Sequence, residues 1–328
     1  MRVRLTQIDG AMPNLALMKL QHWHRARGDE TVLTTSVQPD LFEGAYDRVY
    51  GSAIFKFSAN RVERFRQEWP GAIVGGTGTG DLQTVEQLIG QDYEHYCYDG
   101  WDVDYSLGFT QRGCRLKCKF CVVPTKEGKN RSVNTIAAIW RGAEYAKKLH
   151  LLDNDFFGQP REQWEARAAE IVDGGFQVCM SQGINVRLLD DVGAATLARM
   201  NYRSADFASR RLYTAWDNLG DEGVFFRGME RLAKAGIPPT HVMAYMLIGF
   251  DKRETWAAIW YRYKKMRELG ILPYPMVYDR SRADLLCFSR WAKMPRLYET
   301  IEWPDYKKET KSPESVAAWR EVYERAAA

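Results

Sequence analysis

Three cysteines lie close together in the segment RGCRLKCKFCVVP, which begins at Arg112 and ends at Pro124. Cys114, Cys118 and Cys121 are four and three residues apart, and they make up half of the chain's six cysteines. A closed tetrahedral metal site takes four protein ligands, and a single disulfide takes two cysteines. Three neighbouring thiols therefore indicate a metal centre with one position left for another ligand.

Two kinds of metal centre fit three thiols. A structural zinc ion would need a distant fourth ligand, for which Cys97, His95 and His150 are the candidates. A cubane iron–sulfur cluster is normally held by four cysteines, so three would leave one iron open to a small ligand. An open iron is what a catalytic cluster requires.

The C-x3-C-x2-C spacing, with Phe120 directly before the last cysteine, resembles the signature of the radical SAM superfamily. The resemblance implies that Cys114, Cys118 and Cys121 hold a [4Fe–4S] cluster and that S-adenosylmethionine (SAM) binds its fourth iron. It also implies reductive cleavage of SAM to a 5′-deoxyadenosyl radical, which takes a hydrogen atom from the substrate. An electron donor of the flavodoxin or ferredoxin type would supply the electron.

The pattern of elements around these cysteines predicts an α/β fold with two domains. Strands and helices alternate over residues 1–90, which predicts a short doubly wound, Rossmann-type domain. Residues 91–110 read as a linker. Residues 111–300 are expected to form a partial (β/α)6 radical SAM barrel, and residues 301–328 a helical tail with Ser312 as its N-cap.

The second barrel strand is expected to end at LLDNDFFGQP, where Asn154 and Asp155 follow its apolar residues. Radical SAM barrels place polar groups here for the amino group of the methionine moiety, so the resemblance implies a cofactor-binding role for both residues. The alternative is that they cap the next helix, which Asn and Asp also do well.

The third strand is followed by SQGINVRLLDD, which supplies Ser181, Gln182 and Arg187. The resemblance implies that these residues bind the ribose hydroxyls and the carboxylate of SAM. A guanidinium suits a carboxylate because its donors form a planar fork. The alternative for Arg187 is an ion pair with Asp190 or Asp191.

Two more residues complete the expected cofactor site. Asp217 ends the fourth strand and is expected to hydrogen-bond cofactor or substrate, and Gly249 ends the fifth strand, where it would let the backbone approach adenine. In both cases the residue type and its place at a strand end, rather than a longer motif, carry the expectation.

The first domain contains the glycine-rich stretch IVGGTGTG, with Gly75, Gly76, Gly78 and Gly80. The domain resembles the cobalamin-binding domains that precede some radical SAM barrels, but it lacks their Asp-x-His-x-x-Gly motif. Bound cobalamin is the weaker interpretation, and a vestigial domain or one that shapes the substrate site is the stronger one. A tight packing turn is the alternative for the glycines.

Composition limits the cellular setting and the substrate. The sequence has no apolar run of membrane-span length and no secretory signal, so we expect a cytoplasmic protein that does not bind membranes. A net charge of +4 and eleven tryptophans favour a nucleic-acid or nucleotide substrate slightly. We therefore expect an enzyme, of the isomerase, lyase or transferase type, that rearranges or modifies a nucleobase substituent. The alternatives are a cobalamin-dependent radical SAM methyltransferase and a zinc-stabilised nucleic-acid-binding module.

Overall fold

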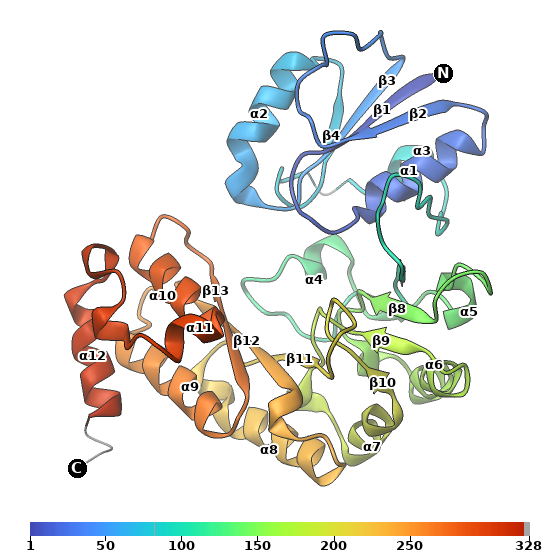
Figure 1. Cartoon of the computed structure of the whole chain (residues 1–328). Helices are drawn as coiled ribbons and strands as arrows, with labels where there is room; N and C mark the ends of the chain where they lie inside the picture. The colour runs from blue at the N-terminus through green and yellow to red at the C-terminus, as the bar shows by residue number, and fades with distance from the viewer. Residues whose placement is uncertain (82, 325–328) are drawn as a thin grey trace. The chain divides into compact units, whose positions relative to one another are not determined.

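The chain consists of two compact units that meet between Asp104 and Tyr105. The structure is a computed structural model that describes residues 1–81 and 83–324 (Figure 1). Both units are mixed α/β structures with parallel sheets, as the alternation of strands and helices predicted. The division lies inside the segment 91–110 that was predicted to be a linker. No helix in the described ranges has the length and apolar content needed to span a membrane.

The first unit is built on one parallel sheet with the strand order β2-β1-β3-β4. This order is that of the flavodoxin-like doubly wound fold, without its last strand. The strands are β1 (Arg2–Gln7), β2 (Glu30–Thr34), β3 (Arg48–Ser52) and β4 (Ile73–Gly75). The helices are α1 (Leu15–Arg25), α2 (Ala59–Glu68) and α3 (Val85–Ile89), with the short 3-10 helix η1 (Lys56–Ser58) before α2.

Two apolar clusters give this sheet a core on each face. Val3 and Leu5 of β1 pack with Leu17 of α1, and Val85 of α3 joins the same cluster. Phe65 of α2 belongs to the second cluster, which contains residues from the ends of β1, β3 and β4. Helices on both faces of a parallel sheet are the doubly wound arrangement that the sequence predicted.

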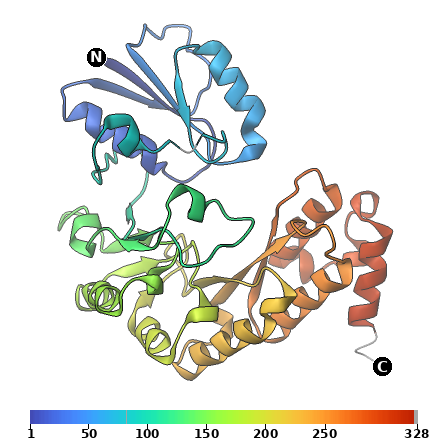
Figure 2. The ribbon, with the colours of Figure 1, turned by 180° about the vertical axis from the view of Figure 1, so that it is seen from behind.

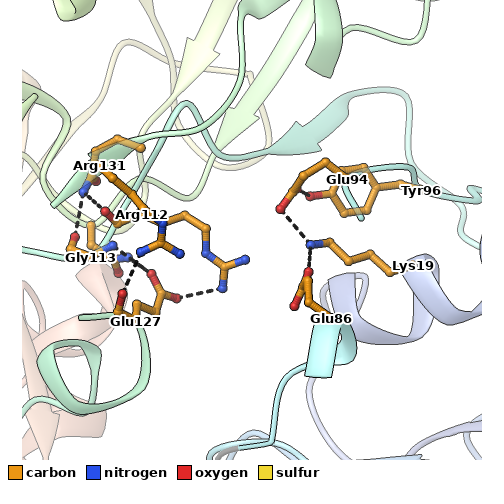
Figure 3. A network of polar contacts seen from close by, with 10 residues as sticks. Lys19, Glu86, Glu94, Tyr96, Arg112, Gly113, Glu127 and Arg131 are labelled. Atoms are coloured by element: carbon orange, nitrogen blue, oxygen red, sulfur yellow. Dashed lines mark hydrogen bonds and ion pairs between the residues drawn. The ribbon is translucent and has the colours of Figure 1, made fainter. Parts of the chain in front are cut away.

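The first part of the predicted linker is fastened to the first unit. Lys19 of α1 is only 3% exposed and forms ion pairs with Glu86 and with Glu94, the latter at 2.9 Å (Figure 3). The backbone N–H of Cys97 donates a hydrogen bond to the carbonyl oxygen of Met18. Residues 91–104 therefore behave as part of this unit.

The second unit contains two parallel sheets whose strands follow chain order, β5-β8-β9-β10 and β11-β12-β13. Within the described residues these sheets do not join into one continuous sheet or a closed barrel. The first sheet comprises β5 (Ser106–Gly108), β8 (Lys148–Leu151), β9 (Gln177–Cys179) and β10 (Asn201–Tyr202), and the second β11 (Leu212–Ala215), β12 (Val242–Ile248) and β13 (Leu272–Val277).

Helices cover one face of these strands and enclose a single large core (Figures 1 and 2). In β12, Val242, Ala244 and Met246 are completely buried against this core, whereas Met243 and Tyr245 point to the opposite face. The helices are α5 (Ile136–Ile139), α6 (Arg161–Asp173), α7 (Asp191–Arg199), α8 (Glu222–Lys234), α9 (Trp256–Glu268), α10 (Ala283–Lys293), α11 (Pro295–Tyr298) and α12 (Pro313–Tyr323).

The C-terminal tail packs onto the second unit. Helix α12 begins after Ser312, whose side chain accepts a hydrogen bond from the backbone N–H of Ser315, so the predicted N-cap is confirmed. Trp260 of α9 donates its indole N–H to the carbonyl oxygen of Ser315 at 2.9 Å. The last four residues of the predicted tail, 325–328, lie outside the described residues.

Candidate functional site

The three clustered cysteines lie on one loop, residues 113–130, which we call the cysteine loop. Two short antiparallel strands, β6 (Gln111–Arg112) and β7 (Arg131–Ser132), close its base, and the short helix α4 (Val123–Lys126) lies within it. Gly113 opens the loop with a φ of +78°, and a Cβ there would lie 2.2 Å from the carbonyl oxygen of Lys129. The base of the loop therefore requires glycine at this position.

The thiols of the cysteine loop are free and partly exposed. Burial raises the pKa of Cys114 and of Cys121, and negative charge on the neighbouring thiols adds to both shifts. The three side chains are therefore close enough to interact electrostatically. The backbone N–H of Cys121 donates to the carbonyl oxygen of Cys118 at 3.0 Å, which holds these two residues in one turn.

Three soft sulfur donors on one loop suit an iron–sulfur cluster or a zinc ion. No three His, Cys, Asp or Glu side chains among the described residues are already gathered around a metal position, so binding would have to draw the thiols together. Of the three candidates for a fourth protein ligand, His150 is 0% exposed and its Nε2 bonds the Ser181 hydroxyl at 2.7 Å. His95 and Cys97 belong to the first unit. The burial of His150 and its bond to Ser181 therefore argue against His150 as the fourth ligand.

Asp155, expected to contact cofactor, instead binds the cysteine loop. Its carboxylate is 1% exposed and accepts two hydrogen bonds from the guanidinium of Arg115, at 2.7 and 2.9 Å. Asn130 also donates to this carboxylate, and the Asp155 N–H donates to the side-chain oxygen of Gln111. Asp155 is thus a brace between the end of β8 and the loop, and it forms no helix-capping side-chain bond.

Asn154 has a similar place in the structure. Its side-chain amide donates to Glu127 at 2.8 Å, and Glu127 also accepts hydrogen bonds from the Gly113 N–H and from Arg112 (Figure 3). Arg131 donates to the carbonyl oxygen of Glu127. The structure therefore places Asn154, like Asp155, in the support of the cysteine loop.

The carboxylate of Asp153 completes the brace. It accepts hydrogen bonds from the backbone N–H groups of Thr110 and Gln111, at 2.7 and 3.2 Å, and from the Thr110 hydroxyl. Burial raises the pKa of Asp153 to about 7, although these three donors oppose the shift. All three polar residues after β8 therefore fix the residues that enter and form the cysteine loop.

Ser181 and Gln182 follow β9. The Ser181 hydroxyl pairs with His150, and its carbonyl oxygen accepts a 2.5 Å hydrogen bond from the hydroxyl of Tyr245. Gln182 is exposed. The sequence suggested His150 only as a candidate metal ligand. Its polar side chain within the apolar stretch LHLL is the one sequence signal for its position beside Ser181.

Arg187 lies beside the cysteine loop. Burial acts to lower its pKa, but the carboxylate of Asp221 and a hydrogen bond with the thiol of Cys118 outweigh it and raise the pKa. The ion pair with Asp221 is 2.7 Å long, so neither Asp190 nor Asp191 is its partner. Asp190 instead caps α7.

Asn185 stands next to this arginine in space. Its side-chain oxygen accepts a 3.3 Å hydrogen bond from the Nε of Arg187, while its Nδ2 is buried without a hydrogen-bond partner. A buried donor without a partner is costly in a folded protein and points to a missing acceptor. Asn185 therefore adds an unpartnered donor next to Arg187, whose guanidinium lies beside Cys118.

Asp217 also lies near the loop. Burial raises its pKa, and it accepts a 3.0 Å hydrogen bond from the backbone N–H of Leu247. The charge of Asp217 contributes to the raised pKa of Cys121, which places the two side chains near one another.

Gly249 has a φ of +76°, and a Cβ there would lie 2.7 Å from Leu285. Its N–H donates to Glu254. The position therefore requires glycine for its own backbone conformation, whether or not a ligand approaches it.

A buried arginine that sequence reasoning missed joins the ends of β11 and β12. Arg262 of α9 is 0% exposed and donates to the carbonyl oxygens of Trp216 and Leu247, at 2.9 and 3.0 Å. It also forms an ion pair with Glu254. Because these partners flank Asp217 and Gly249, Arg262 fixes both positions; an arginine on the buried face of a helix was the available signal.

Phe120, which precedes Cys121, contacts the end of β12. Its ring lies 5.6 Å from that of Phe250 in an edge-to-face arrangement, and Phe250 lies 4.9 Å from Tyr278, which follows β13. The cysteine loop is therefore attached to the strand ends on the second sheet as well as to β8. Its residues, Arg187, Asp217 and these aromatic rings all lie at the carboxyl ends of parallel strands, where ligands bind in such folds.

The glycine-rich stretch of the first unit is packed against its own chain. A Cβ at Gly76 would lie 2.2 Å from the carbonyl oxygen of Ala53, and one at Gly78 would lie 2.6 Å from that of Phe55. The Asp9 carboxylate accepts hydrogen bonds from the backbone N–H groups of Ile54 and Phe55. This arrangement supports the packing-turn interpretation over a cofactor cradle.

The sequence matches no protein-family model, and no curated protein matches it.

Proposed function

We propose that the chain is a radical SAM enzyme whose Cys114, Cys118 and Cys121 hold a [4Fe–4S] cluster with S-adenosylmethionine on its fourth iron. When bound and reduced, this pair would supply a 5′-deoxyadenosyl radical that removes a hydrogen atom from the substrate. The observation that carries the proposal is the cysteine loop itself, which is braced at the carboxyl ends of parallel strands with Arg187 and Asp217 beside its thiols.

The finer form of the proposed fold is a partial (β/α)6 barrel. Six strand positions alternate with helices along the second unit if β10 and β11, which no helix separates, share the fourth position. The Ile184 N–H donates to the carbonyl oxygen of Tyr213, which links the segment after β9 to β11. This contact across the two sheets supports a barrel-like succession of strands.

Side chains beside the loop provide donors for a zwitterionic, hydroxylated cofactor. Arg187 and the unpartnered Nδ2 of Asn185 suit a carboxylate, because a guanidinium and an amide both donate in a plane. The Ser181 hydroxyl, held by His150, suits a ribose hydroxyl. We assign Asn154 and Asp155 to positioning of the cysteine loop, since their polar atoms already bind loop residues.

The face of the strands opposite the large core favours an aromatic substrate. Tyr213, Tyr245 and Tyr274 lie on this face in adjacent strands. The ring centroids of Tyr213 and Tyr245 are 6.0 Å apart, and those of Tyr245 and Tyr274 are 5.7 Å apart. Such rings can hold a planar base and exclude water from a radical. We therefore propose that the reaction rearranges or modifies a nucleobase substituent in nucleic acid or a nucleotide.

The proposed chemistry sets conditions on the cell compartment and partners. Free thiols and an oxygen-sensitive cluster require a reducing setting such as the cytoplasm, and the electron would come from a flavodoxin or ferredoxin. We do not assign cobalamin to the first unit, because Asp9 and the packed glycines occupy the position where a doubly wound sheet binds its ligand.

The test is formation of 5′-deoxyadenosine by the anaerobically reconstituted, dithionite-reduced chain in the presence of SAM. Cys118→Ala should reduce the product by at least about a thousandfold, because a cluster ligand is lost. Cys97→Ala, in the first unit, is the matched control and should retain the activity. Equal product from both variants would remove the cysteine loop from the reaction.

A further inference from the structure

A row of aromatic side chains runs from the cysteine loop to the end of β13. Phe120 contacts Phe250, and Phe250 contacts Tyr278, at 5.6 and 4.9 Å between ring centroids. Tyr278 is 50% exposed, and Met276, which precedes it on β13, is 47% exposed. Large apolar surface of this kind is left in water at the carboxyl ends of the strands, where the candidate site lies.

Each of these rings has a cationic residue within two positions of it in the sequence. Lys119 of the cysteine loop, Lys252 after β12 and Arg280 after β13 are all exposed. Four carboxylates share these loops, namely Glu127 of the cysteine loop, Asp251 and Glu254 after β12, and Asp279 after β13. Glu127 accepts hydrogen bonds from Arg112 and Gly113, and Glu254 pairs with Arg262. Asp251 is held by Arg253, and Asp279 is held by the hydroxyl and the N–H of Ser281.

The exposed cations of the three loops come from separate segments of the chain. The pKa of Asp251 is lowered chiefly by its bonds to Arg253, and Lys119 contributes a smaller part. The pKa of Asp279 is lowered chiefly by Ser281, and Lys252 contributes a smaller part. Lys119 therefore lies near Asp251 and Lys252 near Asp279, and the ring contacts of Phe120, Phe250 and Tyr278 bring the three loops to one edge.

We propose that this edge binds a single-stranded segment of nucleic acid, with phosphates on Lys119, Lys252 and Arg280 and a base stacked on Tyr278. The inference rests on the proposed function and narrows its substrate from nucleotides in general to a polynucleotide. Cations on three separate loops match the repeated phosphates of a strand, whereas a mononucleotide carries its charge at one end. An exposed ring needs an unstacked base, which favours a single strand over a duplex.

Binding is measured without chemistry, by fluorescence anisotropy of the full chain with a labelled single-stranded oligonucleotide of about 16 nucleotides. DNA and RNA probes form separate arms, and unlabelled duplex and mononucleotide serve as competitors. We expect the strand to compete at least about tenfold better than mononucleotide at equal phosphate concentration. The logarithm of affinity should fall with the logarithm of salt with a slope of about −2, as three phosphate contacts on a single strand predict.

Two variants test the named contacts against matched controls. Tyr278→Ala should weaken binding by about fivefold or more through loss of stacking, whereas Tyr261→Ala on α9 should not change it. Lys119→Glu combined with Lys252→Glu should weaken binding by about tenfold or more and flatten the salt slope. Lys234→Glu is the charge control, because Lys234 ends α8 and so lies toward the amino ends of the strands.

The outcomes separate this inference from the proposed function. Salt-insensitive binding, preference for mononucleotide or duplex, or equal affinity of Tyr278→Ala and Tyr261→Ala would overturn the inference even if 5′-deoxyadenosine is still formed. Binding of single-stranded nucleic acid that depends on Tyr278 and the two lysines would support the proposed binding edge even if the chain never assembled a cluster. Circular dichroism of each variant checks that the fold is retained.

Discussion

The glycine-rich stretch of the first unit and the cysteine loop of the second occupy equivalent places in their folds. Each follows a strand at the carboxyl edge of a parallel sheet, where such proteins bind ligands. In the first unit the chain itself occupies that place, because Asp9 binds the backbone there and Gly76 packs closely against Ala53. In the second, Asp155 and Glu127 hold the base and flanks of the loop and leave the thiols partly exposed.

The difference shows that buried carboxylates have opposite effects on ligand access at the carboxyl edges of the two units' sheets. The Asp9 carboxylate accepts hydrogen bonds from the backbone N–H groups that an anionic ligand would need, so no such ligand can bind them. The Asp155 carboxylate binds Arg115, which lies between two of the cysteines in the sequence. It so fixes the cysteine loop while the thiols of that loop stay accessible. We expect variants of the two regions to separate stability of the fold from binding of metal.

The largest effect is expected where the cysteine loop begins. Gly113→Ala adds a Cβ against the Lys129 carbonyl in a left-handed backbone conformation, and it should cost about 3 kcal/mol or more and abolish iron binding. Gly128→Ala is the control, because that glycine also has a positive φ but open space around it, and should cost about 1 kcal/mol. Thermal unfolding and iron content measure both; similar losses in the two variants would show that the close approach at Gly113 is unimportant.

Removal of the brace should have the next largest effect. Asp155→Ala leaves the Arg115 guanidinium without its acceptor and removes one of the two acceptors of Asn130. It should lower the free energy of unfolding by about 2 kcal/mol, after allowance for the partial exposure of Arg115. Urea titration measures the change, and limited proteolysis should detect faster cleavage within residues 113–130. Asp251→Ala, which removes an exposed ion pair with Arg253, should leave the free energy of unfolding nearly unchanged. Unchanged proteolysis of the Asp155 variant would contradict the proposed brace.

Removal of the buried carboxylate in the first unit should leave metal binding by the cysteine loop unchanged. Asp9→Ala leaves two backbone N–H groups without an acceptor and should cost about 2 kcal/mol. Hydrogen exchange should accelerate at Ile54 and Phe55, while the iron content of the reconstituted chain stays at the wild-type level. Loss of iron in this variant would mean that the two edges are not independent.

The smallest effect is a pH dependence next to the brace. Burial lowers the pKa of His150 to about 4, below its ordinary value of 6.5, so the unfolded chain takes up a proton first as the pH falls. His150 therefore contributes stability above pH 6.5 that is lost progressively toward pH 4. His150→Asn should show a smaller fall in melting temperature between pH 7 and 5 than wild type, and an equal fall would contradict this assignment.

The sequence predicted the elements better than their connections. Alternation of strands and helices predicted the α/β class of both units, and Ser312 marked the start of the last helix because a cap acts locally. The division of the second unit into two sheets was not predicted, since β10 and β11 are short and no helix separates them. Contacts of residues 91–104 with α1 were also hidden, because an irregular segment carries no periodicity.

For the candidate site, local spacing was again the reliable signal. The three cysteines are close in sequence, so their grouping on one loop followed directly. The bonds of Asn154 and Asp155 to loop residues were not predictable from their position after a strand, because Arg115 and Glu127 are chosen by the folded path of the loop. The role of Arg262 and the bond of His150 to Ser181 were missed for the same reason, as their partners are distant in sequence.

The most direct test of the account is the metal content and absorbance of the chain after anaerobic reconstitution with iron and sulfide. The account predicts about four irons per chain and a broad absorbance near 400 nm, both lost when Cys114, Cys118 and Cys121 are replaced by alanine and both retained in Cys97→Ala. Zinc as the bound metal, or an iron–sulfur spectrum that survives without the three cysteines, would contradict it.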